Sequence, residues 1–283
     1  MNIALHSNDK TRFPNLALLK LSAWHKSQGH SVEQYMPLWS SKYDLVYSSK
    51  VFTWTRDDRP FGKVLRGGTG YKMTNTLPDH IEHHCPDYEG MDYSLGFLTR
   101  GCPNKCSWCI VPTKEGPIRA HADIEEFARH RNVVLMDNNV LAHKHGIEQI
   151  EKMARLDLKV DFNQGMDARL IDDGVAKRLA ALKWIRFIRL ACDHKSQMPY
   201  VKSAVDNLRK AGYRGEIFCY VLVKDVDDAL ERVEFLRGLK VDPFAQPYRD
   251  FESGSEPTWE QRRFARWTNH KAIFKTTKWE QYA

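Results

Sequence analysis

Apolar and polar positions in residues 91–255 alternate between two periods, which predicts strands and helices in regular succession. Short apolar runs predict six strands, at residues 96–99, 132–138, 159–165, 185–193, 216–223 and 242–248. Apolar residues at helical spacing predict five intervening helices, at residues 123–131, 146–156, 174–183, 199–212 and 226–239. The segment VVLM in the second strand is continuously apolar, as in strands buried on both faces. This succession predicts an α/β fold with a parallel sheet.

Residues 1–90 predict a second, smaller α/β unit. Strands are expected at residues 3–7, 31–35 and 44–52, and a helix over residues 15–29 that ends at Gly29. This order is typical of a parallel, Rossmann-like sheet. The glycines of residues 67–70 are interpreted as a tight turn that needs positive φ. The polar residues 77–91 connect the two units.

The composition is typical of a globular protein without a membrane span or a disulfide scaffold. The chain has 283 residues, of which 42% are hydrophobic and 28% are charged, as in ordinary globular proteins. No run reaches the roughly 18 apolar residues of a membrane span, and residues 1–9 lack the form of a signal peptide, so no membrane partner is expected. Six cysteines, three of them in one loop, favour a reducing cytoplasm over a disulfide scaffold. The net charge of +7 suits a polyanionic partner such as RNA, and equally an ordinary solvated surface.

The candidate chemistry lies in residues 96–116, GFLTRGCPNKCSWCIVPTKEG, whose C-x3-C-x2-C loop contains Cys102, Cys106 and Cys109. Cysteine thiolates are the usual ligands of iron–sulfur clusters, and a four-iron cluster needs four ligands. Three cysteines therefore leave one iron open to a substrate or cofactor. The alternative is a structural zinc site, which also needs four ligands. No candidate for its fourth ligand has a familiar knuckle spacing; the candidates are Cys85, His83, His84 and His121.

This loop resembles the signature of the radical S-adenosylmethionine (radical SAM) enzymes, and CIVPTKEG is similar to its continuation in their methylthiotransferase and cobalamin-associated branches. The resemblance extends to about residue 255. It implies a partial, TIM-like (β/α)6 barrel over residues 91–255, which agrees with the predicted count of strands and helices. It also implies a [4Fe–4S] cluster on the three cysteines, with S-adenosylmethionine bound to the fourth iron. An electron from a reductant such as flavodoxin or ferredoxin would cleave this cofactor to a 5′-deoxyadenosyl radical, which abstracts hydrogen from an unidentified substrate.

Polar side chains follow the predicted strands at the edge where the chemistry of parallel barrels gathers. They are Asp137, Asn138, Asn139, Asn163, Gln164, Arg169 and Asp193. The resemblance implies that the first three contact the amino group of S-adenosylmethionine, that Arg169 pairs with its carboxylate, and that Asp193 lies near its ribose. A carboxylate with amide oxygens suits an ammonium group, and the planar fork of arginine suits a carboxylate. The alternative for each residue is a rim position with local hydrogen bonds.

Residues 1–90 also resemble, faintly, the cobalamin-binding domain of one radical SAM branch. No D-x-H-x-x-G motif follows the first strand, and residues 53–63 leave no room for the usual helix. The unit is therefore interpreted as a degenerate relative in which cobalamin is not expected.

The last 28 residues, 256–283, predict a basic, aromatic helix. Thr258 and Gln261 fit a capping box, and Phe264, Trp267 and Phe274 form a stripe at helical spacing. One interpretation is a helix docked on the barrel, and the other is a nucleic-acid contact through cations and rings. Two alternatives to an enzyme follow from the residues: an iron–sulfur or zinc protein that binds nucleic acid without catalysis, and a one-electron carrier.

Overall fold

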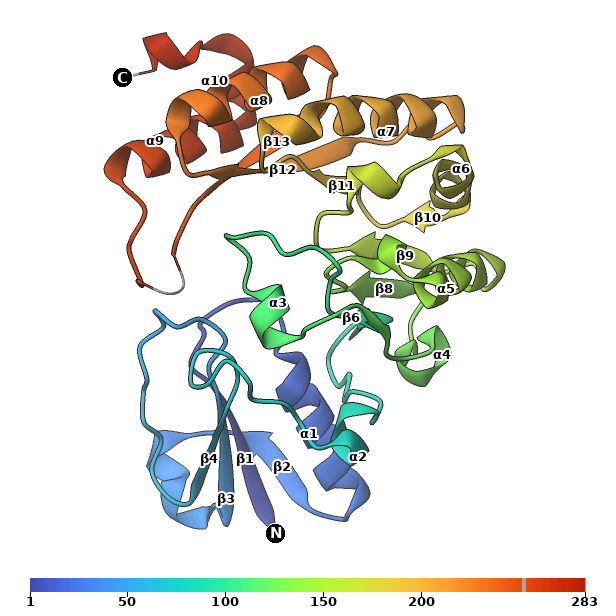
Figure 1. Cartoon of the computed structure of the whole chain (residues 1–283). Coiled ribbons are helices and arrows are strands. Elements are labelled where there is room, and N and C mark those ends of the chain that lie inside the picture. The colour runs from blue at the N-terminus through green and yellow to red at the C-terminus, as the bar shows by residue number, and fades with distance from the viewer. Residues whose placement is uncertain (251–252, 283) are drawn as a thin grey trace.

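The computed structural model describes residues 1–250 and 253–282 and has an α/β architecture with parallel sheets, as predicted (Figure 1). Residues 251–252 and 283, which fall in the expected barrel and tail, lie outside the described residues. Figure 1 shows the N-terminal sheet at the bottom, strands β8 and β9 in the middle, and strands β11 to β13 with their helices at the top. Among the described residues, none of the helices combines the length and the apolar character that crossing a membrane requires.

The N-terminal sheet has the strand order β2-β1-β3-β4, and every neighbouring pair is parallel. Its strands are β1 (Asn2–Ser7), β2 (Ser31–Gln34), β3 (Leu45–Ser49) and β4 (Val64–Gly67). Helix α1 (Leu16–Ser27) packs on one face, where Leu18 and Leu21 join a core cluster with Ile3 and Leu5. The short 3-10 helix η1 (Pro37–Lys42) follows β2. The predicted sheet is confirmed, and β4 is a strand that the periodicity did not indicate.

Strand β3 ends three residues before its predicted end at residue 52. The backbone N–H groups of Val51 and Phe52 donate to the carboxylate of Asp9 (2.5 and 3.3 Å) and are therefore not available to a strand ladder. The predicted glycine turn is confirmed after β4. Gly68 has φ +96°, and a Cβ there would lie 2.4 Å from the carbonyl oxygen of Lys50, so only glycine fits.

The second part of the chain forms two further parallel sheets rather than one continuous sheet. The first has the order β10-β9-β8-β5 and the second β11-β12-β13. Their strands are β5 (Ser94–Gly96), β8 (Asn132–Leu135), β9 (Lys159–Phe162), β10 (Lys183–Trp184), β11 (Ile188–Ala191), β12 (Ile217–Val223) and β13 (Asp242–Pro247). The helices between them are α4 (Ile124–Phe127), α5 (Lys144–Arg155), α6 (Asp173–Ala181), α7 (Met198–Lys210) and α8 (Val226–Gly238). Fully buried side chains such as Ile150, Leu179, Leu208 and Leu236 face these sheets from the helices and form the main core.

The predicted strand at residues 185–193 is corrected by the structure, because the chain changes partners there. β10 pairs with β9 and β11 pairs with β12, and one isolated bridge, Met166 to Leu190, connects the two sheets. The predicted helix at residues 123–131 is also shorter. Ser94 Oγ accepts the N–H groups of Arg129 and His130 (2.8 and 3.0 Å), which draws these residues out of the helix.

The C-terminal segment forms α9 (Trp259–Asn269), α10 (Lys271–Thr276) and the 3-10 helix η5 (Trp279–Gln281). The capping box of Thr258 and Gln261 is confirmed. Phe264 and Trp267 are fully buried, and the side chain of Asn269 bonds both the N–H and the carbonyl of Ala245 on the edge strand β13 (2.8 and 2.9 Å). The C-terminal helices are therefore docked on the sheet that contains β13, and Phe264, Trp267 and Phe274 of the predicted stripe are all buried. Contact of the basic face with nucleic acid stays a prediction.

Candidate functional site

The cysteine loop is closed at its neck by a short antiparallel pair, β6 (Thr99–Arg100) and β7 (Arg119–Ala120). The loop then passes into α3 (Val111–Lys114), and the N–H of Cys109 donates to the carbonyl of Cys106 (3.0 Å). Burial raises the pKa of the thiols of Cys106 and Cys109. Metal binding requires thiolates and would release these protons. As the side chains stand, no group of three or more His, Cys, Asp or Glu residues in the described chain is arranged to hold a single metal ion.

Gly101 determines how the chain enters the loop. Its φ is +81°, and a Cβ there would lie 2.2 Å from the carbonyl oxygen of Pro117. The N–H of Cys102 donates to the carbonyl of Gly116 on the other side of the neck (3.2 Å). A residue with a side chain would force the two strands of the neck apart, so the position before Cys102 needs glycine.

Glu115 stabilises the same neck and was not predicted from the sequence. Its carboxylate accepts the N–H of Gly101 (2.9 Å) and the amide N–H of Asn138 (2.8 Å), and it forms an ion pair with Arg100 (3.0 Å). The glutamate side chain is only 7% exposed. The sequence offers no signal for this role, because the partners of Glu115 lie 14 to 23 residues away and follow no motif.

Asp137 lies beside the strand that enters the loop, where it binds backbone. Its carboxylate accepts the N–H and hydroxyl of Thr99 (2.5 and 2.7 Å) and the N–H of Leu98 (3.1 Å). Burial raises its pKa to about 6 in spite of these hydrogen bonds. The arrangement ties the end of β8 to the entry of the cysteine loop, and the predicted contact with a cofactor amino group stays a prediction.

The side chain of Asn139 lies beside the cysteine loop and has an amide oxygen without a hydrogen-bond donor among the described residues. Its amide nitrogen lies 3.6 Å from the sulfur of Cys102 and 3.3 Å from a carboxylate oxygen of Asp167. Its amide oxygen is buried and has no hydrogen-bond partner among the described residues. Buried polar atoms are normally satisfied, so an unpaired oxygen beside Cys102 indicates a place for a donor.

Asp167 links the loop to the end of β9. It accepts the amide N–H of Asn104 (3.0 Å) and a bidentate pair of hydrogen bonds from Arg169 (2.8 and 2.7 Å). Burial works to raise the pKa of Asp167, but the bonds from Arg169 and Asn104 hold it below its usual range. Arg169 was predicted from the sequence as a carboxylate ligand, and here its carboxylate partner is Asp167 of the same chain.

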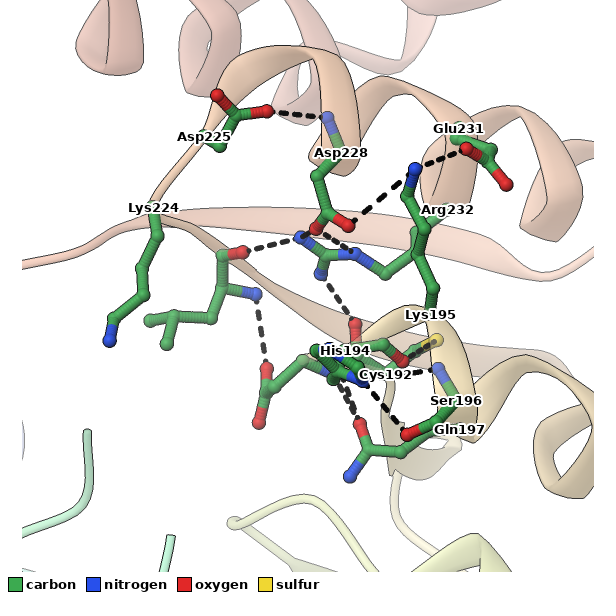
Figure 2. A network of polar contacts seen from close by, with 12 residues as sticks. Cys192, His194, Lys195, Ser196, Gln197, Lys224, Asp225, Asp228, Glu231 and Arg232 are labelled. Atoms are coloured by element: carbon green, nitrogen blue, oxygen red, sulfur yellow. Dashed lines mark hydrogen bonds and ion pairs between the residues drawn. The ribbon is translucent and has the colours of Figure 1, made fainter. Parts of the chain in front are cut away.

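Asp193 belongs to a polar network at the ends of β11 and β12. Figure 2 shows its labelled members, among them Cys192, Gln197 and Arg232. Asp193 accepts the N–H of Leu222 (3.0 Å), and burial raises its pKa. The nearly buried Arg232 donates to the carbonyls of Cys192 and Leu222 (2.7 and 2.9 Å) and pairs with Asp228 (2.6 Å). This network fixes the 3-10 helix η4 (Lys195–Gln197), whose residue Gln197 accepts the N–H of Asp193 (2.6 Å).

An open pocket of about 500 Å³ lies between the cysteine loop and the loops that follow β9 and β11. It is lined by Cys106, Trp108, Arg169, His194, Ser196, Gln197 and Tyr200. The structure thus brings Arg169 together with the cysteine loop, and places Asp193 next to a lining residue. Asn163 and Gln164 are not among the described residues that line this pocket. The volume lies in the range of ligand pockets, and the lining is mainly polar, with the rings of Trp108 and Tyr200 among the polar side chains.

The chain is similar over part of its length to a known methylthiotransferase. No family model matches the chain. The ribosomal protein uS12 methylthiotransferase RimO of Syntrophobacter fumaroxidans (strain DSM 10017 / MPOB) is 23% identical over 118 residues. The match covers 34% of this chain, and the chain spans only 27% of that relative. Over about a third of its length the chain is therefore similar to a methylthiotransferase, an enzyme.

Proposed function

We propose that this chain is a radical SAM enzyme in which Cys102, Cys106 and Cys109 hold a [4Fe–4S] cluster and S-adenosylmethionine binds in the adjoining pocket. The observation that carries the proposal is the three-cysteine loop, which Glu115 and Asp167 fix beside a pocket of about 500 Å³. The partial similarity to RimO supports the same class of enzyme. We assign six parallel strands, β5, β8, β9, β11, β12 and β13, to one partial (β/α)6 barrel, in which the Met166–Leu190 bridge connects the two sheets.

Two side chains beside the cysteine loop, Asn139 and Arg169, suit the polar groups of S-adenosylmethionine. The unpaired amide oxygen of Asn139 beside Cys102 is an acceptor suited to the amino group of the cofactor. Arg169 lines the pocket and offers a planar fork for the carboxylate, although it would have to share that fork with Asp167. In this proposal Asp137 positions the loop, and the amino group is held by Asn139.

Cys102, Cys106 and Cys109 would hold the cluster, which would supply the electron for reductive cleavage of S-adenosylmethionine and thus the radical chemistry of this class of enzyme. The chain's own contribution is positioning and shielding. Glu115 and Gly101 fix the entry of the loop, and Arg169 orients the carboxylate of the cofactor. Trp108 and Tyr200 place rings at the wall of this open pocket, where they would cover one side of a bound cofactor. The electron would come from a partner such as flavodoxin or ferredoxin.

The test is anaerobic reconstitution followed by iron and sulfide analysis. We expect about four iron and four sulfide per chain, lost when any one of the three loop cysteines is replaced by Ala. Cys85→Ala is the matched control, because Cys85 is similarly half-buried and lies outside the loop. With dithionite, the reconstituted protein should release 5′-deoxyadenosine from S-adenosylmethionine. Stoichiometric zinc without sulfide would refute the proposal and favour a zinc protein.

A further inference from the structure

A series of aromatic rings and cations leads from the pocket toward the N-terminal sheet. Its members, here called the aromatic–basic track, are in order Trp108, Lys224, Tyr248, Arg249, Trp54 and Phe52. The ammonium group of Lys224 lies 5.5 Å from the ring centre of Trp108 and 4.3 Å from that of Tyr248. Trp108 also lines the pocket, so the track begins inside the proposed active site.

The track crosses to the N-terminal sheet through Arg249, the residue after Tyr248. Its guanidinium carbon lies 4.4 Å from the ring centre of Trp54. Glu256 fixes this guanidinium in a bidentate ion pair (2.5 and 2.8 Å). Segments nearly 200 residues apart in the chain therefore meet in one line of alternating rings and charges. Figure 1 shows the loops after β1 and β3 on the side of the N-terminal sheet that faces α3.

The far end of the track is a stacked pair of exposed rings. Phe52 and Trp54 are 38% and 47% exposed and stack on each other with ring centres 4.8 Å apart. The loop that presents them is anchored by the buried carboxylate of Asp9, which accepts the N–H of Phe52 (3.3 Å) and the hydroxyl of Thr55 (2.6 Å). Two adjacent exposed rings form an apolar surface on which another planar group can stack.

The charge around this ring pair is suited to an anion. Lys10, Arg12, Arg56 and Arg59 are exposed in the two loops after β1 and β3, and none forms an ion pair with another described residue. Of the acidic residues in these loops, Asp9 is buried, Asp57 accepts the hydroxyl of Tyr71 (2.8 Å), and Asp58 is exposed, so the four cations exceed the exposed carboxylates. Phosphate groups could bind these free cations while the rings remain available for stacking.

We propose that the aromatic–basic track binds a single-stranded nucleic acid and delivers one nucleotide to the pocket beside Trp108. Rings that alternate with cations suit bases and phosphates, because every base has a face that stacks and every linkage carries a charge. The C-terminal helix is the weaker candidate, since Phe264 and Trp267 are buried there. Delivery to the pocket rests on the proposed function, whereas binding to the track needs neither cluster nor cofactor.

The experiment measures fluorescence anisotropy of labelled oligo(U) and oligo(dT) of matched length, with the full chain at low salt. Trp54→Ala and Phe52→Ala should each weaken binding by about tenfold, as expected for the loss of one stacked base. Trp39→Ala is the matched control: Trp39 is 57% exposed in the same N-terminal unit, outside the track, and its loss should leave affinity unchanged. Tighter binding of one oligonucleotide identifies RNA or DNA as the natural class.

Salt dependence tests the charges separately. Replacing Lys10, Arg12 and Arg56 together by Gln should lower the slope of log affinity against log salt by up to about two, because each phosphate contact on a single strand contributes about 0.7. The matched triple replacement of Arg266, Lys275 and Lys278, exposed cations of the C-terminal segment, should leave the slope unchanged. A slope that is lowered by the C-terminal replacement and unchanged by the Lys10, Arg12 and Arg56 replacement would overturn the proposal and identify the C-terminal helices as the binding site.

Three further results would overturn the proposal that the track binds nucleic acid. They are the absence of oligonucleotide binding at low salt, equal affinity of Trp54→Ala and the unchanged protein, and competition by polyglutamate as effective as that by unlabelled oligonucleotide. If Trp54→Ala lowers the thermal midpoint of unfolding, Trp54→Phe and Trp54→Leu replace it, and equal binding by both would refute stacking. Normal reconstitution without oligonucleotide binding refutes this inference alone. Normal oligonucleotide binding without a cluster refutes the proposed function alone.

Discussion

Removal of the Glu115 carboxylate should loosen the neck of the cysteine loop. Glu115→Ala leaves the guanidinium of Arg100, 18% exposed, without its partner and leaves the N–H of Gly101 without an acceptor. Breaking a buried ion pair costs about 3–5 kcal/mol, and an unsatisfied buried donor about 1–3 kcal/mol. Because Arg100 retains some access to water, we expect a loss near the lower limit, about 3 kcal/mol. Glu115→Gln keeps an acceptor and should cost about half as much.

The assay combines urea unfolding with amide hydrogen exchange at Gly101. A local loss of about 3 kcal/mol corresponds to roughly 100-fold faster exchange of this amide, since each tenfold change is about 1.4 kcal/mol. The matched control is Glu151→Ala, which breaks a pair with Arg178 at 2.6 Å whose side chains are both 41% exposed. A pair so exposed should cost less than about 1 kcal/mol.

The charge swap Arg100→Glu with Glu115→Arg examines the ion pair itself. It restores opposite charges but does not restore the acceptor for Gly101, so it should recover about 1 kcal/mol relative to the sum of the single variants. Among these variants, the iron content after reconstitution should be lowest where hydrogen exchange at Gly101 is fastest. Two results would refute the reasoning: a Glu115→Ala cost no larger than that of Glu151→Ala, or unchanged exchange at Gly101.

The remaining predictions concern single residues around the loop and in the core. Burial raises the pKa of Asp137 to about 6, above its unfolded value of about 3.9, so the native state binds this proton more tightly. The contribution of this group to stability is therefore present below about pH 4 and falls by up to about 3 kcal/mol as the pH rises through about 6. Urea unfolding of Asp137→Asn between about pH 4 and about pH 7 should not show this decrease in the free energy of unfolding. A pH profile of Asp137→Asn equal to that of the unchanged protein would contradict the raised pKa of Asp137. Asn139→Ala should weaken S-adenosylmethionine binding by about tenfold in calorimetry while iron and sulfide stay normal, as removal of one hydrogen bond to a charged group implies; unchanged affinity would exclude Asn139 as the acceptor. Gly101→Ala should destabilise the loop and reduce its iron content, because the Cβ would lie 2.2 Å from a carbonyl oxygen; full cluster loading would show that the neck adapts. Trp267→Ala should lower the free energy of unfolding by about 3–5 kcal/mol, since its fully buried ring packs α9 into the core; a loss below about 1 kcal/mol would show that α9 contributes little.

Local patterns in the sequence determined the α/β class, the order of strands and helices, the capping box of α9 and the spacing of the three cysteines. These features depend on neighbours along the chain, where apolar periodicity and side-chain type carry the information. Helix α5 illustrates this, because its buried residues Ile150 and Met153 lie on the stripe that the periodicity indicated. The predicted strand ends and the resemblance of the cysteine loop indicated part of the candidate site: Asn138 and Asn139 lie at the loop, and Arg169 lines its pocket. The other side chains of the pocket, Trp108, His194, Ser196, Gln197 and Tyr200, were not predicted.

Only the tertiary structure decided which distant groups satisfy each backbone N–H and each charge. Ser94 accepts hydrogen bonds from the N–H groups after α4, and Asp9 accepts hydrogen bonds from the N–H groups after β3. Glu115 accepts the N–H of Gly101. None of these pairings follows a sequence motif, because each depends on how separate elements pack. The break between β10 and β11 has the same origin, since the chain exchanges its partner β9 for β12 there. Periodicity reports which side chains are buried, whereas the three-dimensional packing decides what each one contacts.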